Sequence, residues 1–208
     1  MRKGVFITFE GIDGSGKSTQ AKEVAKTLNN NGYPTVLTRE PGGSTGAELI
    51  RKLLVEGDPD RWSPETEMLL FTAARRDHFE KTINPALREG KVVISDRFAD
   101  STRIYQGATR GDLRSIVDKL HTLMIGYEPD LTIIIDIDPS DSLARGLARG
   151  SGEDRFEDFG LNFQQKLRRG FLNLATDFGG RCKVINGAQS IEKVSSEILT
   201  RVYSKLNG

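Results

Sequence analysis

The hydrophobic pattern of the chain alternates between two kinds of segment. Five short apolar runs, rich in β-branched residues, are typical of buried parallel strands: Val5–Phe9, Thr35–Thr38, Val92–Ser95, Leu131–Ile137 and Lys183–Ile185. Longer stretches with helical spacing lie between and after them: Lys17–Asn30, Ser63–Phe79, Asp112–Ile125, Ser140–Ala148, Leu161–Asp177 and Ile191–Leu206. The alternation predicts right-handed crossovers and one α/β domain over residues 1–208, with a five-stranded parallel sheet covered by helices on both faces.

Local signals mark the ends of some of these elements. Ser63 is a favourable N-cap with Pro64 at the first helical position, and Gly32 closes the first helix. Two connections, Arg39–Gly46 and Arg149–Asp158, are rich in glycine and in charged residues. We expect both to be exposed and mobile.

The segment Gly11–Ser18 fits the phosphate-loop motif G-x-x-x-x-G-K-[ST] at every specified position, between a predicted strand and a predicted helix. Its glycines let backbone N–H groups converge on an anion, and the helix N-terminus adds about half a positive charge. Lys17 is expected to reach the β- and γ-phosphates of a nucleoside triphosphate, and the Ser18 hydroxyl to hold Mg²⁺. The expected triphosphate-binding residues are Gly11, Ile12, Asp13, Gly14, Ser15, Gly16, Lys17, Ser18 and Thr19.

Composition narrows the classes of partner. The 208 residues carry a net charge of +1, so no global field favours nucleic acid or an anionic membrane. The single cysteine, Cys182, excludes an internal disulfide and is expected to be a small apolar filler. No run approaches the ~20 apolar residues of a membrane span. Near the N-terminus, two basic residues precede the short apolar run Val5–Phe9, which breaks at Glu10 and is too short for the core of a signal peptide. We expect a cytoplasmic protein without nucleic-acid or membrane partners.

A triphosphate site is compatible with three classes of protein: a GTPase switch, an ATP-driven motor and a kinase that phosphorylates a small acceptor. A guanine-selective switch needs an N-K-x-D-type loop after a strand, which neither "DIDPSD" nor "INGAQS" supplies. A motor usually needs a larger chain. The length and the arginines of this chain favour the kinase.

Arginines and one aspartate mark where the acceptor would meet the triphosphate. Arg97 follows a buried strand, at the sheet edge where ligands bind in open α/β folds, and Asp96 beside it is placed to hold magnesium through water. Arg145, Arg149 and Arg155 flank the second glycine-rich connection, as in a lid over about 145–158. Such arginines accelerate phosphoryl transfer on the order of 10³-fold or more. A solvated surface charge is the alternative for each of the three.

The acceptor decides whether a catalytic base is needed. A hydroxyl acceptor would profit from a positioned Asp or His, whereas a monophosphate with a second pKa of about 6 is already dianionic at pH 7. His78 and His121 both lie in helical pattern, away from any glycine loop, and are interpreted as structural.

Four stretches, in order along nearly the whole chain and beginning with the phosphate loop, resemble the thymidylate kinase family of P-loop nucleoside monophosphate kinases. They are "FEGIDGSGKSTQ", "TREPGG", "LLFTAARRDH" and "DRFADSTRIYQG". The lid region is similar to the bacterial form, which carries its arginines in the lid, and Gly14 stands where the other form has an arginine. The resemblance implies transfer of the ATP γ-phosphoryl group to dTMP, giving dTDP and ADP in dTTP synthesis, with Mg²⁺ and a homodimer formed through packed helices.

The resemblance also implies roles around the acceptor base. Phe71 would stack on the thymine ring, because a flat apolar face suits a base. Arg75 would bind the O4 atom, with Thr102 near the remaining edge and Gln106 at N3–H. From the residues alone, the neighbouring Leu69 and Leu70 favour a plain core position for Phe71. Arg75 and Arg76 point about 100° apart on a helix, so only one should face the base, and Arg75 is the choice.

On the sugar and phosphate side, Asp13 would accept a hydrogen bond from the 3′-OH, and Tyr105 would pack beneath the sugar and disfavour a 2′-hydroxyl. Arg97, with Arg51, would hold the acceptor phosphate, and Glu40 would lie near this phosphate and a magnesium-bound water. The catalytic set implied is Lys17, Arg97, Arg149 and Arg155. Two rivals remain: a kinase for another nucleotide or a deoxynucleoside, and a nucleotide-binding module without catalysis.

Overall fold

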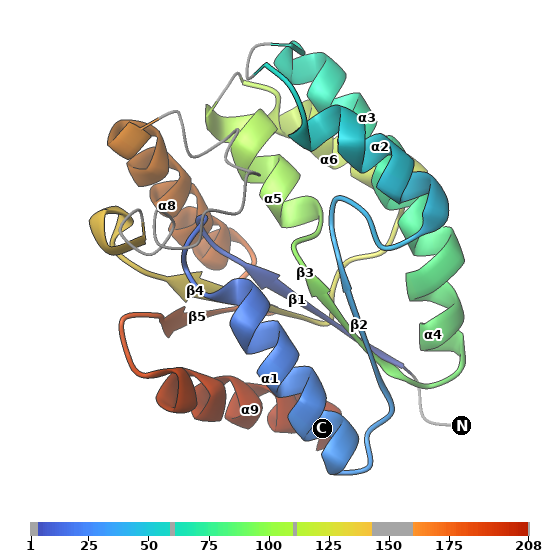
Figure 1. Cartoon of the computed structure of the whole chain (residues 1–208), viewed down its shortest axis with the longest axis vertical. Coiled ribbons are helices and arrows are strands. Elements are labelled where there is room, and N and C mark those ends of the chain that lie inside the picture. The colour runs from blue at the N-terminus through green and yellow to red at the C-terminus, as the bar shows by residue number, and fades with distance from the viewer. Residues whose placement is uncertain (1–3, 59–60, 110–111, 143–159, 208) are drawn as a thin grey trace.

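The computed structural model describes residues 4–58, 61–109, 112–142 and 160–207. Its five strands form one all-parallel sheet in the order β2-β3-β1-β4-β5, as the hydrophobic pattern predicts (Figure 1). The strands are β1 (Val5–Glu10), β2 (Thr35–Arg39), β3 (Val92–Asp96), β4 (Leu131–Asp136) and β5 (Cys182–Asn186). Each begins and ends within one residue of its predicted bounds.

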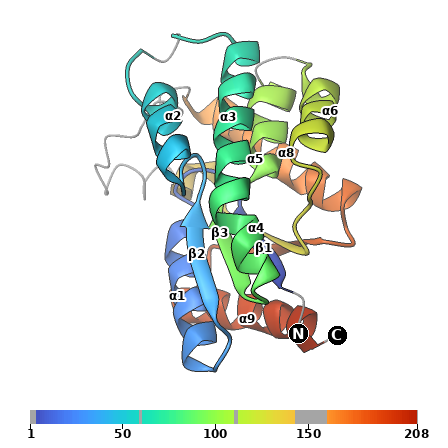
Figure 2. The ribbon, with the colours of Figure 1, turned by 90° about the vertical axis from the view of Figure 1, so that its right-hand side faces the viewer.

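Helices cover both faces of the sheet. The helical elements described are α1 (Lys17–Asn30), α2 (Thr45–Val55), α3 (Pro64–His78), η1 (Phe79–Ile83), α4 (Asn84–Arg88), α5 (Ala99–Ile104), η2 (Tyr105–Thr109), α6 (Arg114–Met124), α8 (Gly160–Asp177) and α9 (Ile191–Asn207). Helices α1 and α9 lie on one side of the sheet, and α4, α5 and α8 lie on the other (Figure 1). Helix α2 and the first turns of α3 stand beyond the carboxyl end of β2 (Figure 2).

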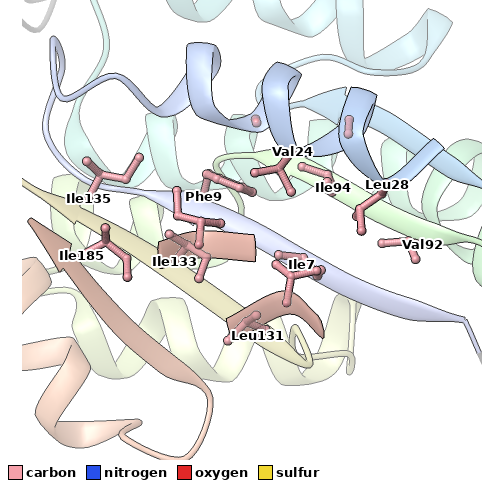
Figure 3. Packing of buried hydrophobic residues seen from close by; sticks show 14 of the residues in the cluster. Ile7, Phe9, Val24, Leu28, Val92, Ile94, Leu131, Ile133, Ile135 and Ile185 are labelled. Atoms are coloured by element: carbon pink, nitrogen blue, oxygen red, sulfur yellow. The ribbon is translucent and has the colours of Figure 1, made fainter. Parts of the chain in front are cut away.

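The central strands are buried on both faces, which explains their continuous apolar runs. Ile7 and Phe9 of β1 point toward Val24 and Leu28 of α1, with Ile94 and Ile133 from the neighbouring strands (Figure 3). Phe6, which directly precedes Ile7 in the sequence, packs on the opposite face. Fully burying each such side chain contributes roughly 1.5–3 kcal/mol, so this double-sided packing holds the sheet in one register.

Five helical segments were not expected from the pattern: α2, η1, α4, α5 and η2. Helix α2 begins at Thr45, inside the connection Arg39–Gly46, while α4 and α5 are too short for a helical period to be read. The expected exposure of that connection holds for Arg39 and Thr45, which are exposed, but not for Glu40, which is 6% exposed, or for Gly42, which is buried. The inner side of this loop packs against α3, where His78 contacts Glu40 and Gly43. Ser63 does cap α3, its Oγ accepting from the Thr66 N–H.

Strand register brings the polar chemistry to one edge. Phe9 pairs with Asp96, Asp96 also pairs with Arg39, and Glu10 pairs with Ile134. The chain leaves β1 into the phosphate loop at this carboxyl edge, next to the end of β3. Segments that are distant in sequence therefore share one edge, where parallel α/β sheets bind ligands. No helix among the residues described is long and apolar enough to cross a membrane.

Candidate active site

A cavity of about 410 Å³ opens at the carboxyl edge of β1, β2 and β3. It brings together most of the predicted site: Asp13, Gly14, Gly16, Lys17, Ser18, Glu40, Arg51, Phe71, Arg75, Asp96, Arg97, Thr102, Tyr105 and Gln106. Gly11, Ile12, Ser15 and Thr19 do not line it: Ile12 is buried in the core beneath the loop, and Thr19 is exposed on α1. The predicted lid residues Arg145, Arg149 and Arg155 lie outside the described residues.

The phosphate loop has the backbone that its glycines permit. Gly14 has φ of +80°, and a Cβ atom there would lie 2.3 Å from the carbonyl oxygen of Ser142. The loop therefore packs backbone to backbone against the segment after β4. Helix α1 then begins at Lys17, so its unpaired N–H groups and the loop face one anion-binding concavity.

Lys17 projects back over this loop. Its Nζ donates to the carbonyl oxygen of Ile12 at 2.7 Å, and the side chain is only 6% exposed. Burial, and next the positive charge of Arg97, lower the pKa of Lys17 to about 8, although Asp13 acts against this shift. The ammonium is thus poorly compensated and has much to gain from phosphate oxygens.

Ser18 and Asp96 place two oxygen groups side by side. The Ser18 hydroxyl donates to Asp96 Oδ2, and Asp96 Oδ1 is buried without a hydrogen-bond partner among the described residues. A hydroxyl and a carboxylate of this kind are the oxygen ligands that hard divalent cations prefer, so the pair fits magnesium. Within the described part of the chain, no group of three or more His, Cys, Asp or Glu residues could hold a metal.

Arg97 crosses the cavity to Asp13. The guanidinium donates to the Asp13 carboxylate, to Ser101 Oγ at 2.8 Å and to the Tyr105 hydroxyl at 3.1 Å. Tyr105 in turn donates to the second oxygen of Asp13 at 2.7 Å. Burial alone would raise the pKa of Asp13, but Arg97 and Lys17 outweigh it and lower that pKa to about 2. Asp13 is therefore ionised and is a hydrogen-bond acceptor at neutral pH.

Arg75, and not Arg76, faces the cavity, as the helical geometry requires of at most one of them. Arg75 is 3% exposed, and its Nε donates to Glu40 Oε2 at 2.8 Å. Its Nη2 donates to Thr102 Oγ1 at 2.9 Å. Arg76 is exposed on the other side and pairs with Glu80. The Arg75 guanidinium also donates to the carbonyl oxygen of Phe98 and lies over the Phe98 ring. Together with Glu40 and Thr102, these contacts fix the orientation of the Arg75 side chain.

The remaining acceptor-side residues complete the wall. Phe71 is half-buried on α3 and lines the cavity, so it is not a plain core residue. Gln106 is 1% exposed, and its amide nitrogen donates to Glu67 Oε2 at 3.1 Å. Arg51 of α2 donates to the carbonyl oxygen of Pro41 at 2.6 Å and reaches the same space.

Comparison with known proteins accounts for this combination of groups. The family model described as thymidylate kinase matches residues 9–198. The chain belongs to the thymidylate kinase family. It is 65% identical to the thymidylate kinase of Dinoroseobacter shibae over 199 residues, which are 96% of each chain. It is 60% identical to that of Ruegeria pomeroyi, covering 98% of this chain and 97% of the relative.

A solved structure agrees with the fold. The crystal structure of thymidylate kinase from Ehrlichia chaffeensis superposes with a TM-score of 0.77 at 38% identity, covering 96% of this chain and 98% of that one. The fold is therefore that of the P-loop nucleoside monophosphate kinases, and the motif resemblance is confirmed. In this thymidylate kinase family member, the motif residues and the cavity residues largely coincide.

Glu10 is a site residue that the sequence pattern did not single out. It is fully buried at the end of β1, where its carboxylate accepts from the Phe98 N–H at 2.8 Å and from Ser101 Oγ at 2.6 Å. Burial, and next the negative charge of Asp100, raise the pKa of Glu10 to about 7. Between these anchors Arg97 adopts φ of +68°, a left-handed conformation that costs a non-glycine residue about 1–2 kcal/mol. The sequence did offer one signal for Glu10, because it is a single charged residue at the end of an otherwise apolar predicted strand.

His78 lies next to a glycine loop, contrary to its expected separation, although it does not itself line the cavity. Its ring is fully buried between Thr38 Oγ1 at 2.7 Å and Glu40 Oε1 at 3.0 Å, and it lies directly beneath Gly43. His78 is structural, as predicted, but what it supports is the loop that carries Glu40. His121 lies outside the cavity lining, edge-on to the ring of Phe98.

Cys182 is a core residue, as expected from its isolation in the sequence. It is 4% exposed and packs in the cluster between α8 and the sheet. Burial raises the pKa of its thiol to about 12, so it is not a nucleophile at neutral pH.

The lowered pKa of Lys17 predicts proton uptake when a triphosphate binds. In the free protein Lys17 begins to lose its proton near pH 8, whereas phosphate oxygens beside it raise its pKa. Calorimetric titration with ATP, in buffers of different ionisation enthalpy, should show uptake that grows from pH 7.5 to 8.5 and exceeds about half a proton at pH 8.5. Lys17→Arg, which stays charged, should abolish this growth; equal uptake by both proteins contradicts the assignment.

The close packing of Gly14 predicts a local effect of adding one methyl group. Gly14→Ala should weaken ATP affinity by about tenfold or more, because the loop must shift away from the Ser142 carbonyl oxygen. Gly32→Ala is the matched control, since Gly32 has φ of +81° but open space around it. It should lower the free energy of unfolding by about 1 kcal/mol and leave ATP affinity unchanged. Equal ATP affinities of the two variants would refute the packing argument.

Proposed function

We propose that the chain transfers the γ-phosphoryl group of ATP to dTMP, giving ADP and dTDP for the synthesis of dTTP. One observation supports this most strongly: the phosphate loop and the aromatic and polar side chains suited to a base line a single cavity, with Arg97 between them. Two nucleotides bound from opposite ends would bring their phosphates together at this arginine. The family membership supports the same assignment.

On the donor side, we assign the triphosphate to the loop Gly11–Ser18. Lys17 would contact the β- and γ-phosphates, exchanging the Ile12 carbonyl for phosphate oxygens. Ser18 and Asp96 would hold Mg²⁺, which, when bound, neutralises phosphate charge. Asp96 is well placed for this role because one of its oxygens is buried and has no hydrogen-bond partner among the residues described.

On the acceptor side, we assign the base to the wall of Phe71, Arg75, Thr102 and Gln106, with Phe71 stacking on the ring. Asp13 would accept from the sugar 3′-OH, and Tyr105, hydrogen-bonded to Asp13, would occupy the space of a 2′-hydroxyl. Arg97 would exchange Asp13 for the acceptor phosphate, with Arg51 beside it and Glu40 near this phosphate and a magnesium-bound water.

The chemistry needs positioning and charge neutralisation more than acid–base catalysis. A dTMP phosphate is already dianionic at pH 7 and can attack in line without a base. Arg97 and Lys17 would hold the two nucleotides in place and stabilise the negative charge of the transition state, and closure over the site would exclude the water that otherwise hydrolyses ATP. Arg149 and Arg155, outside the described residues, remain our candidates for the lid arginines.

We also propose a cytoplasmic homodimer. Large apolar side chains are exposed on three helices that pack side by side: Leu49 and Leu53 of α2, Leu69 of α3, and Ile116, Leu123 and Met124 of α6. Leu123 is 74% exposed, so its burial against a second copy would recover most of its transfer free energy. Several exposed large apolar side chains on neighbouring helices are consistent with an association surface.

Substrate choice is tested with a panel of monophosphates. In a panel of dTMP, dUMP, UMP, dCMP, AMP and GMP, ADP release should be faster with dTMP than with dCMP, AMP or GMP, because only pyrimidines with O4 and N3–H match Arg75 and Gln106. It should also be faster with dTMP than with UMP, because Tyr105 would occupy the space of a 2′-hydroxyl. Arg97→Ala should lose turnover by on the order of 10³-fold while keeping ATP affinity. Equal rates across the panel, or preference for a purine, overturn the assignment. Binding without turnover would identify a module without catalysis.

The association surface is tested by charge insertion. Leu123→Glu should weaken dimerisation by more than about tenfold, because a buried unpaired carboxylate is costly to desolvate. Light scattering after size exclusion, over a range of protein concentrations, reports the mass. Ile191→Glu is the control, since Ile191 is 54% exposed on α9, on the opposite side of the sheet. If both variants keep the mass of the wild-type dimer, or if the wild type is a monomer, this surface is not the interface.

A further inference from the structure

The orientation of the Gln106 side-chain amide is set by a buried neighbour, Glu67. The amide nitrogen donates to Oε2 of Glu67 at 3.1 Å, and Glu67 is fully buried on α3. Gln106 itself is 1% exposed and lines the cavity. Because the NH₂ end of its amide is bound to Glu67, the carbonyl end is the one left to meet a ligand. Glu67 does not line the cavity and has no direct access to a ligand.

The chemistry of Glu67 decides which end of the amide faces the ligand. A carboxylate oxygen can only accept a hydrogen bond, whereas an amide offers an NH₂ donor at one end and a carbonyl acceptor at the other. With the amide reversed, two acceptor oxygens would face each other at 3.1 Å in a buried place with no hydrogen between them, which is unfavourable. Glu67 therefore directs the NH₂ group to itself and leaves the Gln106 carbonyl oxygen for the cavity.

Arg75, which lines the same cavity, can only donate hydrogen bonds. Arg75 has no acceptor atom, and its guanidinium is held by Glu40, Thr102 and the Phe98 carbonyl. The wall thus offers a donor from Arg75 next to an acceptor from Gln106. Thymine offers the complementary pair, an O4 acceptor beside an N3–H donor. Cytosine offers the inverse pair, an N4 amino donor beside an N3 acceptor.

We propose that Glu67 is a specificity-determining positioning residue: by orienting the Gln106 amide, it makes the site reject cytosine nucleotides. This rests on the proposed function, which assigns the thymine base to this wall. Phe71 contributes affinity without this discrimination, because every base has a stacking face. Uracil has the same edge as thymine at these atoms, so Glu67 does not separate the two.

The proposal is tested by removing the acceptor-only character of Glu67. In Glu67→Gln, residue 67 can present either an NH₂ group or a carbonyl to Gln106, so the Gln106 amide is free to turn. The ratio of kcat/KM for dTMP to that for dCMP should fall by about tenfold or more, with KM for ATP unchanged. Calorimetric binding of dTMP and dCMP should show the same fall in the affinity ratio.

Matched variants separate orientation from stability. Glu67→Asp keeps an acceptor-only group and should retain the discrimination even where affinity for both nucleotides weakens. Glu65→Gln, on the exposed face of the same helix, should leave the ratio unchanged. If Glu67→Gln does not fold, Glu67→Met removes the same acceptor with a side chain of similar volume and should lower the ratio in the same way.

The outcomes distinguish this inference from the proposed function. A wild-type chain that does not phosphorylate dTMP refutes the proposed function, while the ratio of binding affinities still tests Glu67. A folded Glu67→Gln variant that keeps the wild-type preference refutes the role of Glu67 alone. The role is equally refuted if Glu67→Asp and Glu67→Gln lose the preference to the same extent.

Discussion

The two hydrogen bonds that Glu10 accepts, from Phe98 and from Ser101, join the end of β1 to the start of α5. They enclose Arg97, whose left-handed backbone turns its side chain back toward the phosphate loop. Arg97 itself donates its backbone N–H to the Phe9 carbonyl and accepts from Ser95 Oγ, so these bonds and the Glu10 connection together hold its left-handed conformation. Asp96 on one side of the turn and Ser101 on the other take their positions from the same constraint.

The cations Arg75 and Arg97 are paired with carboxylates before any nucleotide binds. Asp13 accepts from Arg97 and lies near Lys17, while Glu40 pairs with Arg75. Buried charges without partners would be costly, so these carboxylates keep the cations in place at a tolerable free energy. Phosphate oxygens arriving at Arg97 and Lys17 would replace interactions that already exist. The cations are therefore oriented in advance, which reduces the reorganisation needed during transfer.

Residues behind the cavity wall determine what the wall can recognise. His78 supports Glu40 and so Arg75, and Glu67 supports Gln106. These supporting residues are buried, and each offers a hydrogen-bonding group of defined character to its neighbour. Recognition of a base edge depends on the direction of each donor and acceptor. For this reason, a support that never touches the ligand still contributes to specificity.

The sequence by itself determined the parallel sheet, the phosphate loop and most of the cavity-lining residues, because each depends on local pattern or on a contiguous motif. The continuous apolar runs of β1 and β4 required burial on both faces, and Gly11–Ser18 required an anion. Helix α2 and the burial of Glu40 depended on packing against α3, which no local period records. The roles of Glu10, His78 and Glu67 came only from tertiary structure, since their partners Ser101, Glu40 and Gln106 lie 91, 38 and 39 residues away. A hydrogen bond between such distant residues is created by the fold, and a single sequence carries no mark of it.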